Sequence, residues 1–298
     1  MPLAPCRPRQ LQYQLFRGSQ ARADGVLTTT QLRSSAWVRV GRDLYADARL
    51  ERDHELACRA VALRLPEYVA FAGPSAAALL GVTHAADFRD PVHVVVPADL
   101  RLGNANGLIV HRVQLGPDDV EAAGDLRRTS PNRTVWDLAC WLDPVRSVPT
   151  IDALLAQGLV SVERLHQTIA DRQPGRGRVR VRRTVELADG RAQSPQESRL
   201  RVRLVQAGLP RPEAQYEVRI GSLILHPDLA WPEYRVALEY DGRWHDERQP
   251  FHRDRRRLRS FAGASWLVVP VTSEAVRYDF PGVVRDVRNA LRSRGAPL

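Results

Sequence analysis

Hydrophobic positions along this chain follow helical spacing in some segments and strand spacing in others. Residues 56–65 and 75–80 carry apolar side chains at the spacing of helices. Residues 92–96 and 108–111 are short apolar runs typical of buried strands. The mixture predicts an α/β (α+β) fold.

The first block, residues 1–50, predicts a small domain of its own. A short helical stretch and residues 27–32 precede residues 37–45, which have the pattern of two short strands around a Gly-Arg-Asp turn. A helix followed by a basic hairpin is the outline of a winged helix, in which Arg39 and Arg42 would contact phosphate. A plain surface hairpin explains the same residues equally well.

Residues 51–170 are expected to form a second, mixed domain of helices and strands. Ser130 and Pro131 begin one of its helices, because Ser is a favoured N-cap and Pro suits the first helical position. Nothing in this block clusters into a catalytic constellation. His93 and His111 fall within expected strands, where a histidine is more often a satisfied structural residue than a ligand.

Residues 171–192 are rich in arginine and predict a linker. Glycine and proline near its start suggest a hinge, and the arginines then run into a short helix that ends near residue 190. Such a run is either a solvated linker or an arm that grips phosphate through Arg178, Arg180 and Arg182.

Residues 193–298 predict a third domain. Ser194, Pro195 and Glu197 have the spacing of a capping box and open a helix that stops at Gly208, so a structural role is sufficient to explain Glu197. The other elements expected here are strands at residues 216–220, 223–231, 235–240 and 266–271, and helices at residues 252–261 and 281–294.

The turn between the second and third of these strands has a chemical consequence. If Trp231 pairs with Val236, the antiparallel register puts Asp228 directly opposite Glu239. Directly opposed side chains have Cβ atoms about 5 Å apart, and two carboxylates that close repel each other. A divalent cation such as Mg²⁺ (or Mn²⁺) removes that penalty, because hard cations take oxygen ligands. In another register both acids face water, and the two residues do not form a metal site.

Polar residues that follow the third strand extend this candidate site. Gly242 ends the strand and places His245 nearby, where a neutral imidazole suits a general base or a proton donor. Arg253 and Arg256 follow on the expected helix and, with Arg243, would contact the nucleic-acid backbone. A solvated helix face is the more usual meaning of such a run.

Composition and charge indicate the kind of partner and the cellular compartment to expect. The 298 residues carry a formal charge of +10, which favours a polyanionic partner, most simply nucleic acid. All 44 lysine-plus-arginine residues are arginine, so no lysine is present to act as a base or clamp. No apolar run approaches the roughly 18 residues that span a bilayer. With no apolar signal segment at the start and three widely spaced cysteines, the sequence predicts a cytoplasmic protein without membrane contact.

A first resemblance concerns the front half of the chain. Residues 37–45, residues 129–139 (TSPNRTVWDLA) and residues 154–165 resemble the AbiEi-type antitoxins of type IV toxin–antitoxin systems. The resemblance implies DNA binding by the first block and a cognate toxin as a partner.

A second resemblance covers residues 194–291, which are similar to a family related to the very-short-patch-repair endonucleases, within the PD-(D/E)XK superfamily. Its motifs are PQES at 195–198, PDLAWPE at 227–233, LEYDGRWH at 238–245 and RDRR at 253–256. The resemblance implies hydrolysis of DNA phosphodiester bonds with Mg²⁺.

The same resemblance implies roles for individual residues. Asp228 and Glu239, with the Tyr240 carbonyl, would hold the metal. Glu197 matches the helix acid of the superfamily, and His245 matches a histidine near the metal site. The motif lysine is missing, because Asp241 occupies its position.

Two hypotheses from different classes follow. The first is an active endonuclease that an N-terminal winged helix delivers to DNA, which the opposed acids favour. The second is an antitoxin or transcriptional regulator whose nuclease-like domain no longer cuts, which the missing lysine and the antitoxin-like front half favour.

Overall fold

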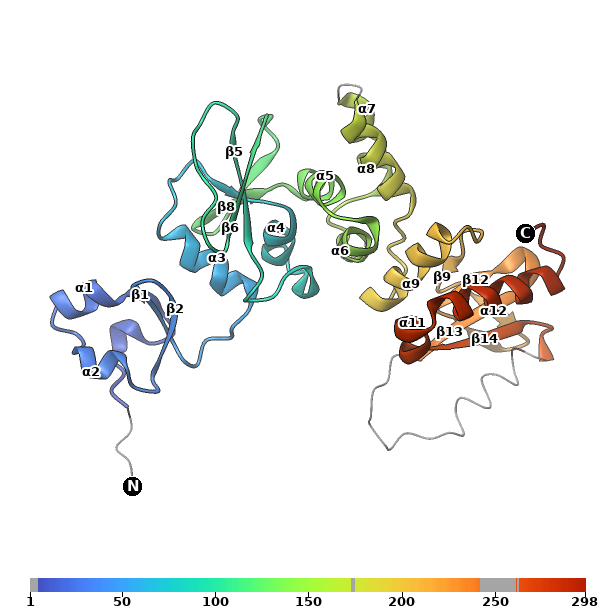
Figure 1. Ribbon diagram of the computed structural model, residues 1–298, viewed down its shortest axis with the longest axis horizontal. Helices are drawn as coiled ribbons and strands as arrows, with labels where there is room; N and C mark the ends of the chain where they lie inside the picture. Colours follow the sequence, from blue (N-terminus) through green and yellow to red (C-terminus); the bar gives the residue numbers. More distant parts are fainter. Residues whose placement is uncertain (1–4, 173–174, 242–260, 262) are drawn as a thin grey trace. The chain divides into compact units, whose positions relative to one another are not determined.

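The computed structural model describes residues 5–172, 175–241, 261 and 263–298 (Figure 1). The chain divides into two compact units, Met1–Asp137 and Leu138–Leu298. Four predicted site residues lie outside the described residues: Arg243, His245, Arg253 and Arg256.

The first fifty residues contain the expected helix and hairpin. Three antiparallel strands lie in the order β1-β3-β2, and two short helices separate β1 from β2 in sequence. Thr28 and Gln31 form a reciprocal capping box at α2, and Phe16 packs edge-on against Trp37 in the core, with 5.1 Å between ring centroids. The bounds are η1 (Arg9–Leu11), β1 (Leu15–Arg17), α1 (Gly18–Ala23), α2 (Thr29–Leu32), β2 (Trp37–Gly41) and β3 (Leu44–Asp47).

The rest of unit 1 is a five-stranded sheet in the order β6-β5-β4-β8-β7 with helices packed on it. The apolar runs at residues 92–96 and 108–111 form the strands β5 and β6, as predicted, and the two strands pair in parallel. The bounds are α3 (His54–Ala62), β4 (Ala70–Phe71), α4 (Gly73–Leu79), η2 (Thr83–Ala85), β5 (Val92–Pro97), β6 (Leu108–Val113), β7 (Val120–Ala123), β8 (Leu126–Thr129) and α5 (Pro131–Trp141), which runs across the unit boundary.

Arg133, which lies in the motif at residues 129–139, is buried and serves the fold. Its Nε donates to Asp137 at 2.9 Å, and one terminal nitrogen donates to Asp119 at 2.6 Å and to the Gln114 carbonyl at 3.1 Å. A buried charge is tolerated when it is paired and hydrogen-bonded in this way.

Unit 2 begins with helices that include most of the expected linker. The arginine-rich segment is helical from residue 176 to residue 186, and Val181 and Val185 are buried in it. Half of the segment expected to be a linker is therefore a packed helix. Val181 and Val185 are four residues apart and so lie on the same face of that helix. The bounds are α6 (Pro144–Ala156), α7 (Val162–Asp171), α8 (Arg176–Glu186) and α9 (Pro195–Gln206).

A buried ion pair joins α6 to α9. Arg201 and Asp152 have exposed side-chain fractions of 1% and 2%, and a guanidinium nitrogen lies 2.5 Å from the carboxylate. The Asp189 N–H also donates to Asp152, at 2.7 Å. Burial raises the pKa of Asp152 to about 6, although the positive charge of Arg201 opposes the shift. The pair thus fixes the last domain of the chain onto the helices before it.

The C-terminal sheet has four strands in the order β14-β13-β12-β9. Two strand predictions need correction. Residues 218–220 and 223–225 form a separate hairpin, β10–β11, and the expected strand at 223–231 breaks before β12 at Pro227 and Asp228. The first sheet strand is instead β9. The bounds are β9 (Glu213–Ala214), β10 (Val218–Ile220), β11 (Leu223–Leu225), β12 (Leu229–Trp231), η3 (Pro232–Tyr234), β13 (Val236–Asp241), β14 (Leu267–Thr272), α11 (Ser273–Tyr278) and α12 (Phe280–Ser293).

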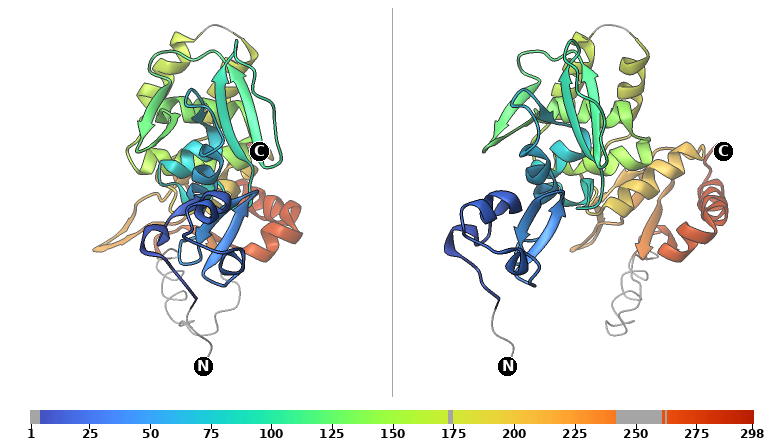
Figure 2. Two further views of the ribbon diagram at one scale, coloured as in Figure 1. Left: turned by 90° about the vertical axis from the view of Figure 1, so that its left-hand side faces the viewer. Right: turned by 60° about the vertical axis from the view of Figure 1, so that its left-hand side comes forward.

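The two faces of this sheet are covered differently. Side chains from α9, α12 and the sheet face that contains Leu229 and Leu238 form one apolar core. Figure 1 shows α9 and α12 beside this sheet. On the other face, Val268 packs in a smaller cluster with Phe261 and Val218 of the hairpin. The hairpin tip extends away from the sheet (Figure 2), and Ile224 on it is 48% exposed.

The mixed α/β class predicted from the sequence is confirmed. Within the described ranges, no helix combines the length and the apolar character that crossing a membrane requires.

Replacing Arg201 should test the ion pair between α6 and α9. Arg201→Met leaves Asp152 buried without its countercharge, and we expect a loss of about 3–5 kcal/mol of stability. Adding Asp152→Asn should recover much of it, because the neutral amide still accepts the Asp189 N–H. Thermal unfolding followed by circular dichroism measures both variants. Arg182→Met, which removes an exposed pair with Glu186 at 3.7 Å, should change stability by no more than about 1 kcal/mol. Equal effects of the buried and exposed substitutions would contradict this account.

Candidate functional site

The register predicted from the sequence for β12 and β13 is confirmed. Trp231 pairs with Val236, and Leu229 pairs with Leu238. Continued by one residue, this pairing sets Asp228 opposite Glu239. Because side chains alternate along a strand, both acids belong to the face opposite to the Leu229 core.

Asp228 accepts two hydrogen bonds at the end of the β12 ladder. The backbone N–H of Tyr240 donates to one carboxylate oxygen at 2.6 Å, and Gln215 Nε2 donates to the other at 3.3 Å. These two donors fix the orientation of the carboxylate. The strand end therefore presents an oriented carboxylate.

Glu197 lies in the same hydrogen-bond network, and its role differs from the expected capping box. Ser194 Oγ does accept the Glu197 N–H at 3.2 Å, as predicted. The Glu197 carboxylate, however, accepts from the Gln193 N–H at 3.0 Å and from Gln215 Nε2 at 3.1 Å. Glu197 is 7% exposed, so a buried acid of α9 is linked to Asp228 through a single amide.

Gln215 was missed by sequence reasoning. It occupies a bend between β9 and β10 with a φ of 51°, a left-handed conformation that few residues other than glycine adopt. Its amide joins two acids that are 31 positions apart in sequence. The spacing of residues in the sequence does not indicate this contact, because it forms only when α9 packs against the sheet that contains β12.

The oxygen atoms near Asp228 are of the type that binds a hard divalent cation, but there are few of them. Carboxylate and carbonyl oxygens suit Mg²⁺. In the part of the chain that the structure describes, no group of three or more His, Cys, Asp or Glu residues could hold a metal ion. Tyr240 is partly buried, and its hydroxyl has a raised pKa because of that burial and of the Asp241 charge.

The arginines of α8 make contacts within unit 2. Arg180 donates through Nε to the Ala139 carbonyl at 3.0 Å and through a terminal nitrogen to the Leu142 carbonyl at 2.9 Å. These carbonyls belong to a helix end, where arginine commonly caps. Arg178 donates to the Arg172 carbonyl, and Arg182 pairs with Glu186. Phosphate binding by these three residues stays a prediction.

Arg39 and Arg42 line two different concave surfaces. Arg39 lines the arginine hollow, about 540 Å³, together with Arg22 and Arg33. Its Nε donates to the Gly41 carbonyl at 3.1 Å. Arg42, in the hairpin turn, lines a larger and more apolar pocket, about 600 Å³, which also contains Phe88 and is called the Phe88 pocket below.

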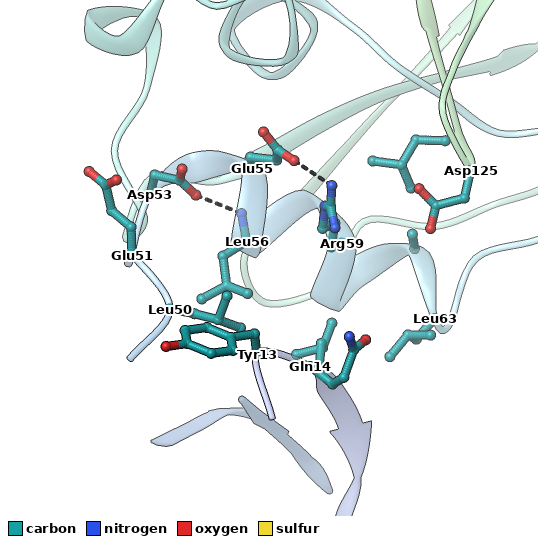
Figure 3. A pocket seen from close by; sticks show the side chains of 13 residues that line it. Tyr13, Gln14, Leu50, Glu51, Asp53, Glu55, Leu56, Arg59, Leu63 and Asp125 are labelled. Atoms are coloured by element: carbon teal, nitrogen blue, oxygen red, sulfur yellow. Dashed lines mark hydrogen bonds and ion pairs between the residues drawn. The ribbon is translucent and has the colours of Figure 1, made fainter. Parts of the chain in front are cut away.

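A third concave surface in unit 1 is acidic. The acidic pocket, about 530 Å³, lies along α3 (Figure 3). It contains one cation, Arg59, whose guanidinium is 2.7 Å from Glu55. Its other charged side chains are Glu51, Asp53 and Asp125. This sign of charge disfavours a nucleic-acid backbone.

His93 and His111 satisfy each other, as expected for strand histidines. Nδ1 of His93 lies 3.0 Å from Nε2 of His111, and the rings stack across β5 and β6. Burial lowers the pKa of His111 to about 4, so the His111 ring is neutral near pH 7.

Comparisons with known proteins give one match over the middle of the chain and others over most of its length. Residues 68–187 match the sequence model described as the AbiEi antitoxin C-terminal domain. Two curated relatives from Mycobacterium tuberculosis, "Uncharacterized protein MT2308" (strain CDC 1551 / Oshkosh) and "Uncharacterized protein Rv2248" (strain H37Rv), are each 31% identical over 275 residues. The matched region covers 89% of this chain and 97% of each relative.

A solved structure is also similar to part of this chain. The crystal structure of the RV2827C protein from Mycobacterium tuberculosis has 18% sequence identity and a TM-score of 0.40, over 58% of this chain and 71% of that chain.

The histidine pair predicts a pH dependence of stability. In the unfolded chain His111 has an ordinary pKa of about 6.5, whereas in the folded chain it is about 4. Between these values only the unfolded chain binds the proton, so stability falls as the pH drops from about 6.5 to about 4. His111→Gln should make thermal unfolding less sensitive to pH in this window, and the exposed His166→Gln should not. A wild-type dependence that survives His111→Gln would contradict the assignment.

Proposed function

The chain belongs to the same family as the two Mycobacterium tuberculosis proteins MT2308 and Rv2248, and we propose that it is a cytoplasmic DNA-binding protein of the AbiEi antitoxin type. In this proposal residues 1–50 contact DNA. Residues 68–187 act as the AbiEi antitoxin C-terminal domain, for which a cognate toxin is the corresponding partner. The match over residues 68–187 is the observation that carries the proposal.

The arginine hollow supports a DNA contact by the first fifty residues. Arg22 ends α1, Arg33 follows α2, and Arg39 lies on β2, so three separate elements turn guanidinium groups toward one surface. Asp43, the acid in this hollow, accepts hydrogen bonds from the N–H and hydroxyl of Ser19, which lower its pKa. Guanidinium groups bind phosphate in bidentate fashion and stay charged at all relevant pH values.

Substitutions in the arginine hollow should weaken binding to duplex DNA. We expect Arg33→Ala and Arg39→Ala each to lower the slope of log affinity against log salt by about one, since each removes a phosphate contact. Fluorescence anisotropy with labelled duplex at several salt concentrations measures this. Arg59→Ala is the control, because Arg59 is paired with Glu55 in the acidic pocket. Affinity that does not respond to salt would rule out a DNA backbone contact.

A second candidate function is metal-dependent cleavage of DNA by residues 193–298. It is favoured by the register that sets Asp228 opposite Glu239 and by the hydrogen bonds that connect Asp228, through Gln215, to the buried Glu197. In this proposal Asp228, Glu239 and the Tyr240 carbonyl would hold Mg²⁺ or Mn²⁺. A bound cation would polarise the scissile phosphate and acidify a water.

The roles of the surrounding residues complete this second proposal. Gln215 would hold Asp228 in place, since its amide donates to both acids. His245, which lies outside the described residues, would act as the proton-transfer group. Asp241 replaces the lysine of the superfamily motif, so the positive charge near the phosphate would come from arginine. Loss of that lysine fits the non-cutting alternative equally, in which the domain only binds DNA.

Metal binding and cleavage can be tested separately. Calorimetric titration of Mn²⁺ and Mg²⁺ should show a site in the wild type that Glu239→Ala abolishes, because one of two carboxylate ligands is removed. Glu233→Ala, an exposed acid in η3, should bind as the wild type does. Asp228→Ala should abolish cutting while DNA affinity stays nearly intact. If neither cation binds even with DNA present, the second proposal fails and the antitoxin-type proposal stands unaffected.

A further inference from the structure

The Phe88 pocket lies beside the hairpin of the first fifty residues. Its wall combines residues 40–44 of the hairpin, one side of α3, and the two chain segments at residues 88–92 and 102–108. Its volume, about 600 Å³, is within the usual range of small-molecule sites, roughly 300–1,000 Å³. Four segments of the chain therefore line a space of ligand size.

Positive charge in this pocket is not balanced. Arg42, Arg64 and Arg89 line it and are exposed, and none of them has a carboxylate within ion-pair distance among the described residues. A terminal nitrogen of Arg64 donates to the Arg42 carbonyl, which holds that guanidinium against the hairpin turn. Asp90 also lines the pocket and accepts the Asp87 N–H, so one carboxylate stands against three guanidinium groups. The pocket thus attracts an anion.

The rest of the lining is apolar and includes one aromatic ring. Phe88 is half-buried beside Arg89, and Val92 and Leu108 are buried at the start of the parallel strands. A tight turn at Asn106 and Gly107 closes the far side. There the Ala105 and Leu108 backbones exchange hydrogen bonds, and Gly107 has a φ of 77°. An aromatic face beside an apolar wall suits a flat ring.

We propose that the Phe88 pocket binds a small organic phosphate that carries an aromatic ring, of the mononucleotide class. Guanidinium groups of Arg42, Arg64 and Arg89 bind the phosphate, since arginine matches its geometry with bidentate hydrogen bonds. The ring stacks on Phe88, an interaction available to every base. This proposal does not depend on the proposed function: Arg42 lies within the residues assigned to DNA, but Arg64, Phe88 and Arg89 lie outside them.

Duplex DNA fits this pocket less well than a free nucleotide. Bases in a duplex stay stacked, and a protein that takes one out must supply the unstacking energy. The acidic pocket on the same helix shows the contrast, because Arg59 there is neutralised by Glu55. An arginine on α3 is thus not by itself a phosphate site. The two pockets differ because, in the part of the chain that the structure describes, the arginines around Phe88 have no carboxylate within ion-pair distance, whereas Arg59 pairs with Glu55.

Calorimetric titration of the full chain with AMP and GMP tests the proposal. We expect saturable binding that Phe88→Ala and Arg89→Gln each weaken at least about tenfold, or about 1.4 kcal/mol. Inorganic phosphate and adenosine should each bind at least about tenfold more weakly than AMP, because each lacks one half of the ligand. Arg59→Gln is the matched control and should bind AMP as the wild type does. Circular dichroism checks that each variant is folded.

Three results would overturn the proposal. One is no saturable binding of either nucleotide at millimolar concentration. Another is binding that Phe88→Ala and Arg89→Gln leave unchanged while both variants are folded. The third is loss of duplex DNA affinity in Arg89→Gln with no nucleotide binding in the wild type, which would make the pocket part of a DNA surface. Arg39→Ala separates the two proposals, since it should weaken DNA binding and leave AMP binding intact.

Discussion

The pairing of Trp231 with Val236 decides on which side of the C-terminal sheet every residue of β12 and β13 lies. Side chains alternate along a strand, so this one register puts Leu229 and Leu238 into the core with α9 and α12. It also puts Asp228 and Glu239 on the opposite face. A slip by one residue would bury both carboxylates in an apolar core and strongly destabilise the sheet. The hydrophobic pattern that builds the core therefore also fixes the position of the two acids.

The elements that sequence reasoning predicted well are those specified by local signals. Continuous apolar runs gave β5 and β6, and the turn residues around Asp43 gave the hairpin of the first fifty residues. The register at Trp231 followed from a short turn, which leaves two strands few ways to pair. Helix starts at Ser194 and Pro131 were visible because capping chemistry is local.

Nonlocal contacts were the part that the sequence concealed. Glu197 has the spacing of a capping box, yet its carboxylate bonds to Gln193 and Gln215 because β9 brings Gln215 beside the start of α9. The hairpin β10–β11 separates from the sheet although residues 223–231 read as one strand, since Pro227 cannot donate to a ladder. The net charge of +10 indicated a polyanion but not which arginines would face it. Arg133 and Arg201 are buried in ion pairs, whereas Arg33 and Arg89 are exposed in hollows.

The buried pair of Asp152 and Arg201 also bears on how the two functional proposals relate. Asp152 belongs to α6, within the region matched by the AbiEi antitoxin C-terminal domain, and Arg201 belongs to α9, which follows that region. A chain cut after residue 187 would lose α9 and expose the α6 surface around Asp152, and a chain that starts at residue 193 would lose α6 and expose the α9 surface around Arg201. Loss of function in either fragment would then report a broken fold instead of an assigned activity. Point substitutions at exposed or strand-end positions keep this pair intact, so they can separate a domain that cuts DNA from one that only binds it.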